Sequence, residues 1–304
     1  MNERPLLFSA GSERLLGVLS LPEHAAPLGV VIVVGGPQYR VGSHRQFVSL
    51  ARALAGGGFA CLRFDYRGMG DSAAPIRGFE AVDEDLHAAI DALFEALPAL
   101  EGVVLWGLCD GASAALMYAP RDVRVQGVVA LNPWVRTEAS LASARIKHYY
   151  RGRLLSPQFW KRVFGGEVQV WRSLTGLVSA IRTRLPGGVA ASQASGVRSF
   201  IDRMGDGWRS MRGRTLVVLS GNDLTAREFA DFCCARPEWR DAITQGGSFA
   251  EIAGADHTLS RREWKHAVEQ LTLDWLRGRL AASVSPHRRK VSASPEKFEI
   301  QRSA

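Results

Sequence analysis

One stretch of the sequence, residues 103–116, constrains the fold and the chemistry of this chain more than any other. Four apolar residues lead into the pentapeptide Gly-Leu-Cys-Asp-Gly at 107–111, and small residues that suit a helix follow. The pattern predicts a buried strand, a sharp turn and a helix, with glycines where a Cβ would clash. Cys109 would then begin a helix, whose dipole favours the thiolate. The alternative is a small core residue at the end of a strand, because free cysteines are often buried.

Strand and helix patterns alternate around this stretch. An antiparallel hairpin is predicted from 6–9 and 14–19. Further strands are expected at 29–34, 59–64, 126–131, 215–219 and 249–253, and helices at 43–54, 83–97 and 262–280. Ser43 is the expected N-cap of the first helix. Such alternation predicts an α/β fold with a mostly parallel central sheet flanked by helices.

A thiol nucleophile needs a base, and the base needs a group that orients it. His257 is the candidate base because it follows the strand predicted at 249–253, and His44 is the alternative. Asp223 is the candidate acid because it directly follows the strand at 215–219, although a turn-forming role would also suit it. Asp256 adjoins His257 in sequence and is poorly placed to accept from its ring, so we expect it to bond the backbone or a lid residue.

A tetrahedral intermediate also needs two backbone N–H donors. The residue after the nucleophile, Asp110, would supply one of them. The loop after the first parallel strand would supply the other, from Gly36 or Gln38, since Pro37 has no N–H. The sequence leaves the choice between these two donors open.

Five motifs together resemble the α/β-hydrolase superfamily over roughly residues 5–280. They are Gly-Gly-Pro at 35–37, Asp-Tyr-Arg-Gly-Met-Gly-Asp-Ser at 65–72, the pentapeptide at 107–111, Gly-Asn-Asp at 221–223 and Asp-His at 256–257. The chain order Cys109, Asp223, His257 is the order of nucleophile, acid and base in that superfamily. The segments 35–46 and 106–111 are similar to the hydrolases of bacterial exosortase A systems, which accompany exopolysaccharide biosynthesis. This resemblance implies a cytoplasmic acyl hydrolase.

Three positions depart from the superfamily pattern. The nucleophile is Cys109, as in dienelactone hydrolases, which implies a preference for activated esters, thioesters or lactones. Val34 replaces the histidine that often precedes the glycine pair. Leu224 stands where many relatives place the acid, one residue after Asp223.

The alternation stops between 134 and 214, where hydrolases of this type carry a lid. We expect a helical lid at 134–214, core segments at 1–133 and 215–281, and a disordered basic tail at 282–304. The lid segment holds 15 Lys and Arg against 4 Asp and Glu, whereas the core segments together carry a net charge of about −6. With its aromatic residues, this charge suits an anionic membrane surface or an amphiphilic acyl substrate with a phosphate-bearing head group; a solvated face is the alternative. No nucleic-acid-binding motif accompanies the charge, so nucleic acid is not expected as a partner.

Several classes of protein are excluded by what the sequence lacks. It has no run of 18 apolar residues and no signal-peptide pattern, which predicts a cytoplasmic protein that can contact the inner membrane surface only peripherally. Its four cysteines match neither a disulfide framework nor a zinc pattern, so we expect no metal and no cofactor.

The functional hypothesis from the sequence is a cysteine-dependent hydrolase of esters or thioesters that acts through an acyl-enzyme. An acyltransferase and a non-catalytic binding protein are the alternatives.

Overall fold

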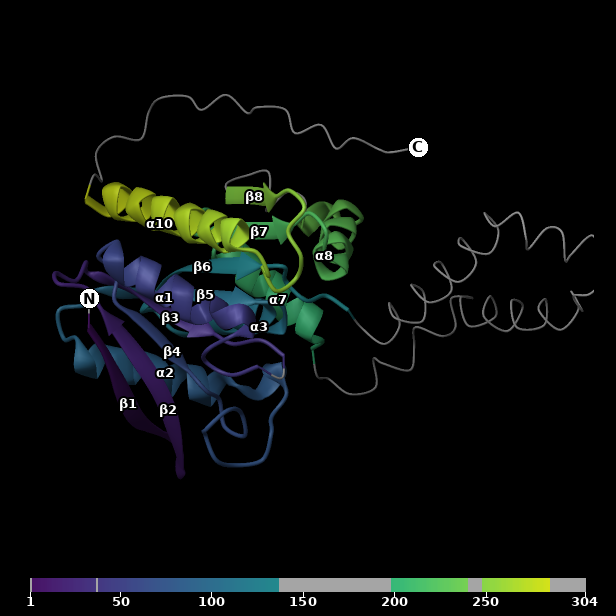
Figure 1. Cartoon of the computed structure of the whole chain (residues 1–304). Helices are drawn as coiled ribbons and strands as arrows, with labels where there is room; N and C mark the ends of the chain where they lie inside the picture. Colours follow the sequence, from purple (N-terminus) through teal and green to yellow (C-terminus); the bar gives the residue numbers. More distant parts are fainter. Residues whose placement is uncertain (1, 37, 137–197, 240–247, 285–304) are drawn as a thin grey trace, which may run out of the picture.

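The computed structural model describes residues 2–36, 38–136, 198–239 and 248–284, and these residues form a layered α/β structure (Figure 1). The central sheet of the described residues has eight strands in the order β1-β2-β4-β3-β5-β6-β7-β8. The strands are β1 (Asn2–Ala10), β2 (Glu13–Leu21), β3 (Leu28–Val33), β4 (Cys61–Phe64), β5 (Gly102–Leu108), β6 (Val125–Leu131), β7 (Thr215–Ser220) and β8 (Ser248–Ile252). Pairing is antiparallel from β1 to β2 and from β2 to β4, and parallel in the rest of the sheet. The predicted fold class is confirmed.

Helices cover both faces of this sheet (Figure 1). They are α1 (Gln46–Gly56), α2 (Asp83–Ala96), α3 (Asp110–Tyr118), α7 (Phe200–Ser210), α8 (Leu224–Cys234) and α10 (Arg262–Val284), with short 3-10 turns at Ser43–Arg45, Phe79–Ala81 and Ala119–Arg121. α1 and α10 pack together on one face, and α3 packs with α2 and α7 on the other. Because both faces are covered, every residue of β3, β5 and β7 is buried, which explains their continuous apolar sequences.

The start of α1 differs from the prediction. Ser43 does not cap this helix, because residues Ser43–Arg45 form a separate 3-10 turn. α1 begins at Gln46, after Arg45 adopts a left-handed conformation with φ 59°, and its N-cap makes no side-chain hydrogen bond. A serine before an apolar periodic pattern often caps a helix, but the pattern cannot show that a 3-10 turn lies between the serine and the helix.

The expected lid range extends into the core. Helix α7 lies within 134–214, yet Met204 and Trp208 are buried and the helix packs on α3. A Cβ on Gly207 would lie 1.7 Å from the carbonyl oxygen of Leu116, so the two helices touch at this glycine. Residues 198–214 therefore belong to the body of the protein. The tail expected at 282–304 begins too early, because helix α10 continues to Val284. Residues 137–197 and 285–304 lie outside the described residues, so the rest of the lid and of the tail stay predictions.

A capping box in the sequence could have revealed α7. The Ser199 hydroxyl accepts from the N–H of Asp202, and the Asp202 carboxylate accepts from the N–H of Ser199. The signal was missed because the apolar pattern around it is irregular. The carboxylate of Asp223 likewise marks the start of α8, a helix that is not among those expected from the sequence.

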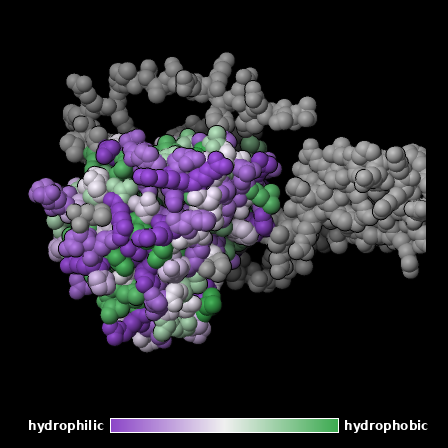
Figure 2. Space-filling model, in the orientation of Figure 1, coloured by the Kyte–Doolittle hydropathy of each residue, from purple (hydrophilic) through white to green (hydrophobic). Residues whose placement is uncertain are grey.

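The face drawn in Figure 2 is mostly hydrophilic, with apolar residues scattered over it in small groups. Within the described part of the chain, we find no helix with the length and hydropathy needed to cross a membrane.

Candidate active site

Cys109 lies in the sharp turn between β5 and α3, as the glycine pattern predicts. Its backbone has φ 58° and ψ −125°, a conformation that residues with a Cβ rarely adopt and that marks functional turns. Its N–H donates to the carbonyl of Leu131 at 2.9 Å, which fixes the turn to the end of β6. A Cβ on Gly107 would lie 2.5 Å from the carbonyl oxygen of Gly111, and one on Gly111 would lie 2.4 Å from that of Val33. Both glycines are therefore required by the crossing of strand and helix.

Asp223 and His257 meet across the ends of β7 and β8. Asp223 Oδ2 lies 2.8 Å from Nδ1 of His257, and the Asp223 side chain is only 7% exposed. The same carboxylate is the N-cap of α8, because it accepts from the N–H of Thr225 at 3.3 Å and of Ala226 at 3.1 Å. The turn-forming role and the role beside His257 are thus both filled by Asp223.

Asp256 shapes the loop that carries His257 and does not contact its ring. Its Oδ1 accepts from the N–H of Thr258 at 3.1 Å and of Ser260 at 3.0 Å. The expectation that Asp256 bonds the backbone is confirmed. His44, the alternative base, is exposed, and its carbonyl accepts from the amine of Lys265 at 3.1 Å.

The surroundings of His257 favour its protonated form. Its hydrogen bond to Asp223 and then its hydrogen bond to the Cys109 side chain raise the pKa of His257 from 6.5 to about 10, against the opposing effect of burial. Burial alone would raise the pKa of Asp223, but the hydrogen bond and charge of His257 outweigh it and lower that pKa. The structure therefore pairs the imidazole with the Asp223 carboxylate at 2.8 Å and places the Cys109 thiol close enough to raise the pKa of His257.

The other described thiols have different surroundings. Cys61 and Cys233 are buried, and burial raises the pKa of both. Cys234 is exposed, and Cys109 is half-buried. Of the buried and half-buried thiols, Cys109 is the one that contributes to the raised pKa of His257.

The N–H of Gly36 is not free to bind an oxyanion. It donates to Oδ1 of Asp110 at 2.5 Å, so the expectation that Gly36 supplies the second donor is wrong for this structure. The sequence could not reveal this contact, because it depends on the rotamer of a side chain 74 residues away. The other candidate, Gln38, has an N–H for which no described residue is an acceptor, while its side-chain Oε1 accepts from the N–H of Ser43 at 3.2 Å. Asp110, the other expected donor, is the first residue of α3, and its role as a donor stays a prediction.

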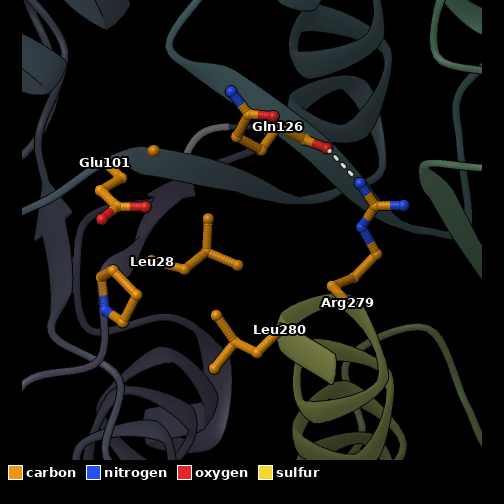
Figure 3. A pocket seen from close by; sticks show the side chains of 7 residues that line it. Leu28, Glu101, Gln126, Arg279 and Leu280 are labelled. Atoms are coloured by element: carbon orange, nitrogen blue, oxygen red, sulfur yellow. Dashed lines mark hydrogen bonds between the residues drawn. The ribbon is translucent and has the colours of Figure 1, made fainter. Parts of the chain in front are cut away.

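A cavity of about 220 Å³, drawn in Figure 3, lies away from Cys109. It is lined by Leu28, Glu101, Gln126, Arg279 and Leu280, and the Arg279 guanidinium donates to the carbonyl of Gln126 at 3.2 Å. Its residues begin β3, β5 and β6, whereas Cys109 follows the end of β5. This cavity is therefore not part of the site around Cys109. Within the described ranges, no three His, Cys, Asp or Glu side chains form a group that could hold a metal ion.

A family model described as "Alpha/beta hydrolase family" matches residues 30–271, which is most of the chain. The chain belongs to the alpha/beta hydrolase family. The matched range begins in β3 and includes Cys109, Asp223 and His257. A search of curated proteins found no match.

Solved structures of other alpha/beta hydrolases share the fold at low sequence identity. A lidless α/β serine hydrolase from Xanthomonas campestris is 16% identical, with a TM-score of 0.56 over 91% of this chain and 95% of the other. A dienelactone hydrolase from Anabaena variabilis is 18% identical, with a TM-score of 0.56 over 91% and 97%. An esterase from Pyrococcus furiosus is 13% identical, with a TM-score of 0.59 over 91% of each chain. At these identities the likeness extends to the fold alone.

Proposed function

We propose that this member of the alpha/beta hydrolase family is a cysteine-dependent acyl hydrolase that cleaves esters or thioesters through an acyl-enzyme. The observation that carries the proposal is that His257, hydrogen-bonded to Asp223 at 2.8 Å, lies close enough to Cys109 for the thiol to raise its pKa, with all three residues at the carboxyl ends of strands β5, β7 and β8. A histidine with a pKa of about 10 is a base strong enough to hold the proton of a thiol. The carboxylate of Asp223 orients the ring and stabilises its charge.

The reaction has two half-steps in this proposal. The sulfur of Cys109 attacks the acyl carbonyl carbon as His257 holds the thiol proton, and a tetrahedral oxyanion forms. The bond to the leaving alcohol or thiol then breaks, and His257 gives that group the proton. Water next attacks the acyl-enzyme while His257 takes one of its protons. The carbon–sulfur bond breaks, the acid is released, and the proton returns to Cys109.

The setting of the reaction is part of the same proposal. The motifs at 35–46 and 106–111 support a place among hydrolases that accompany exopolysaccharide biosynthesis in exosortase A systems. Cysteine in place of serine supports activated esters, thioesters or lactones as substrates. The basic charge of residues 134–214 supports an anionic or amphiphilic substrate, or a peripheral contact with the inner membrane surface from the cytoplasm. No partner nucleic acid, metal or cofactor is proposed.

The test is intact-mass spectrometry together with a hydrolysis assay, using p-nitrophenyl esters and a panel of acyl thioesters. We expect a mass increase equal to the acyl group and release of p-nitrophenol, both lost in Cys109→Ala. Cys234→Ala is the matched control, because Cys234 is exposed and lies on α8 away from the turn. Full activity in Cys109→Ala would overturn the assignment.

The same experiment separates the two alternatives. An acyl-enzyme that accumulates and is released faster by an added amine, thiol or sugar hydroxyl than by water would indicate an acyltransferase. Absence of any acyl-enzyme, with saturable binding of an acyl compound, would indicate a binding protein.

A further inference from the structure

The loop that follows β3 is attached to the nucleophile turn at its beginning. Asp110 Oδ1 accepts from the N–H of Gly36 at 2.5 Å. The approach is so close that a Cβ on Gly35 would lie 2.1 Å from the carbonyl oxygen of Leu108 and 2.5 Å from that carboxylate oxygen. The glycine pair of this loop therefore packs directly against Asp110, the residue after Cys109, although the two belong to separate motifs.

The same loop is attached a second time, at Arg40, by a different carboxylate. Oδ1 of Asp65 accepts from the backbone N–H of Arg40 at 2.6 Å, and Oδ2 pairs with the Arg40 guanidinium. Asp65 is 1% exposed. A charge that is removed from water in this way is tolerated because each oxygen has partners.

The polar loop at 65–72 holds Asp65 in position for this contact. The N–H of Asp71 donates to Oδ2 of Asp65 at 3.1 Å, and the Ser72 hydroxyl donates to the Asp65 carbonyl at 2.9 Å. A Cβ on Gly70 would lie 2.3 Å from Asp65 Oδ2, so the loop closes tightly around the carboxylate. This gives a physical role to a motif whose residues have no part in the steps described above.

We propose that Asp65 and Asp110 are positioning residues that clamp the loop 35–40 at both ends and thereby hold its remaining N–H groups for the oxyanion. Between the two attachments Gly36 is bonded to Asp110 and Pro37 has no N–H, which leaves the N–H groups of Gln38 and Tyr39 as candidates for the second donor beside Asp110. The inference rests on the proposed acyl-transfer function. Placement of such donors is worth a large factor in rate, since loss of one costs about 10²–10³ in kcat and a 1 Å displacement can cost about 10².

Two reactions of the Cys109 thiol distinguish a role in placing the oxyanion donors from a general effect on the reactivity of the thiol. Ester hydrolysis forms a tetrahedral oxyanion, whereas alkylation by iodoacetamide is a direct displacement that forms none. Asp65→Ala should therefore lower kcat for a p-nitrophenyl ester by about 10- to 100-fold with little change in KM, while the alkylation rate of Cys109 stays within about twofold.

Asp110 is tested by two variants of equal charge. Asp110→Ala removes the acceptor for Gly36, whereas Asp110→Asn retains an oxygen that can accept from it. We expect kcat to fall by about 10- to 100-fold in Asp110→Ala and to be largely restored in Asp110→Asn. Hydrogen exchange measured by mass spectrometry should be faster for the peptide that contains 35–42 in Asp65→Ala and Asp110→Ala.

Asp122 provides the matched control. It is buried and accepts from both the backbone N–H and the guanidinium of Arg124, as Asp65 does from Arg40, but it precedes β6 at the opposite end of the sheet. Asp122→Ala should lower thermal stability about as much as Asp65→Ala and leave kcat near that of the wild type.

Three results would overturn the proposed positioning role of Asp65 and Asp110, which we call the clamp. The first is unchanged hydrogen exchange of the backbone amides of 35–42 in both alanine variants. The others are an equal fall of kcat in Asp122→Ala, and a fall of the alkylation rate that parallels the fall of hydrolysis in Asp65→Ala. A wild type that hydrolyses none of the esters would instead remove the proposed function. Exchange in the loop would in that case still decide whether the clamp exists.

Discussion

Replacement of Asp223 separates two roles that one carboxylate fills. It accepts from His257 Nδ1 at 2.8 Å, and it caps α8 through the N–H groups of Thr225 and Ala226. Asparagine retains an oxygen that can cap the helix, and it caps about as well as aspartate, but it carries no charge for the imidazolium. Alanine removes both interactions.

The structure sets the expected magnitudes. A buried hydrogen bond to a charged group is worth about 1.5–3 kcal/mol, and an N-cap about 1 kcal/mol. Asp223→Asn should therefore lower the free energy of unfolding by about 1.5–3 kcal/mol, and Asp223→Ala by about 1 kcal/mol more. In serine triads the corresponding asparagine lowers kcat about 10⁴-fold. We expect a smaller loss here, because a thiolate needs less help from its base.

Urea unfolding and p-nitrophenyl ester hydrolysis measure the two effects on the same samples. Asp256→Asn is the control, because Asp256 lies beside His257 in sequence but bonds the N–H groups of Thr258 and Ser260. Two results would refute the reasoning. One is an equal free energy of unfolding for Asp223→Asn and Asp223→Ala, which would show that the N-cap of α8 adds nothing measurable to stability. The other is a larger loss of turnover in Asp256→Asn than in Asp223→Asn.

Three further predictions follow from the same contacts. Limiting iodoacetamide at neutral pH should label Cys109 before the buried Cys61, whose pKa is raised, and equal labelling on peptide mapping would contradict this. The pKa of His257 is raised from 6.5 to about 10, so its stabilising contribution is complete below pH 6.5 and is lost as the pH rises through 10. The difference in urea stability between wild type and His257→Gln should narrow over that interval, and a difference that widens would be inconsistent with the raised pKa. Gly111→Ala should prevent soluble folding, because its Cβ would lie 2.4 Å from a strand carbonyl, whereas Gly56→Ala meets nothing within 4 Å and should fold normally on expression.

The sheet, the turn at Cys109 and the placement of His257 and Asp223 could be predicted from the sequence. Strands buried on both faces need continuous apolar residues, and the turn at Cys109 needs glycines at 107 and 111, so both leave local signals in the sequence. Carboxyl ends of parallel strands meet at one edge of a sheet, so residues that follow β7 and β8 are brought near each other by topology.

The contacts that hold the loop after β3 could not be predicted from the sequence. The sequence left Gly36 and Gln38 as equal candidates, and the fold assigned the Gly36 N–H to a carboxylate 74 residues away. It also paired Arg40 with Asp65, 25 residues apart. Such contacts leave no periodic pattern, because they depend on backbone turns and rotamers that are set only when separate loops pack together. The same reason explains why α7 was assigned to the lid: its burial comes from contact with α3, which only the folded chain provides.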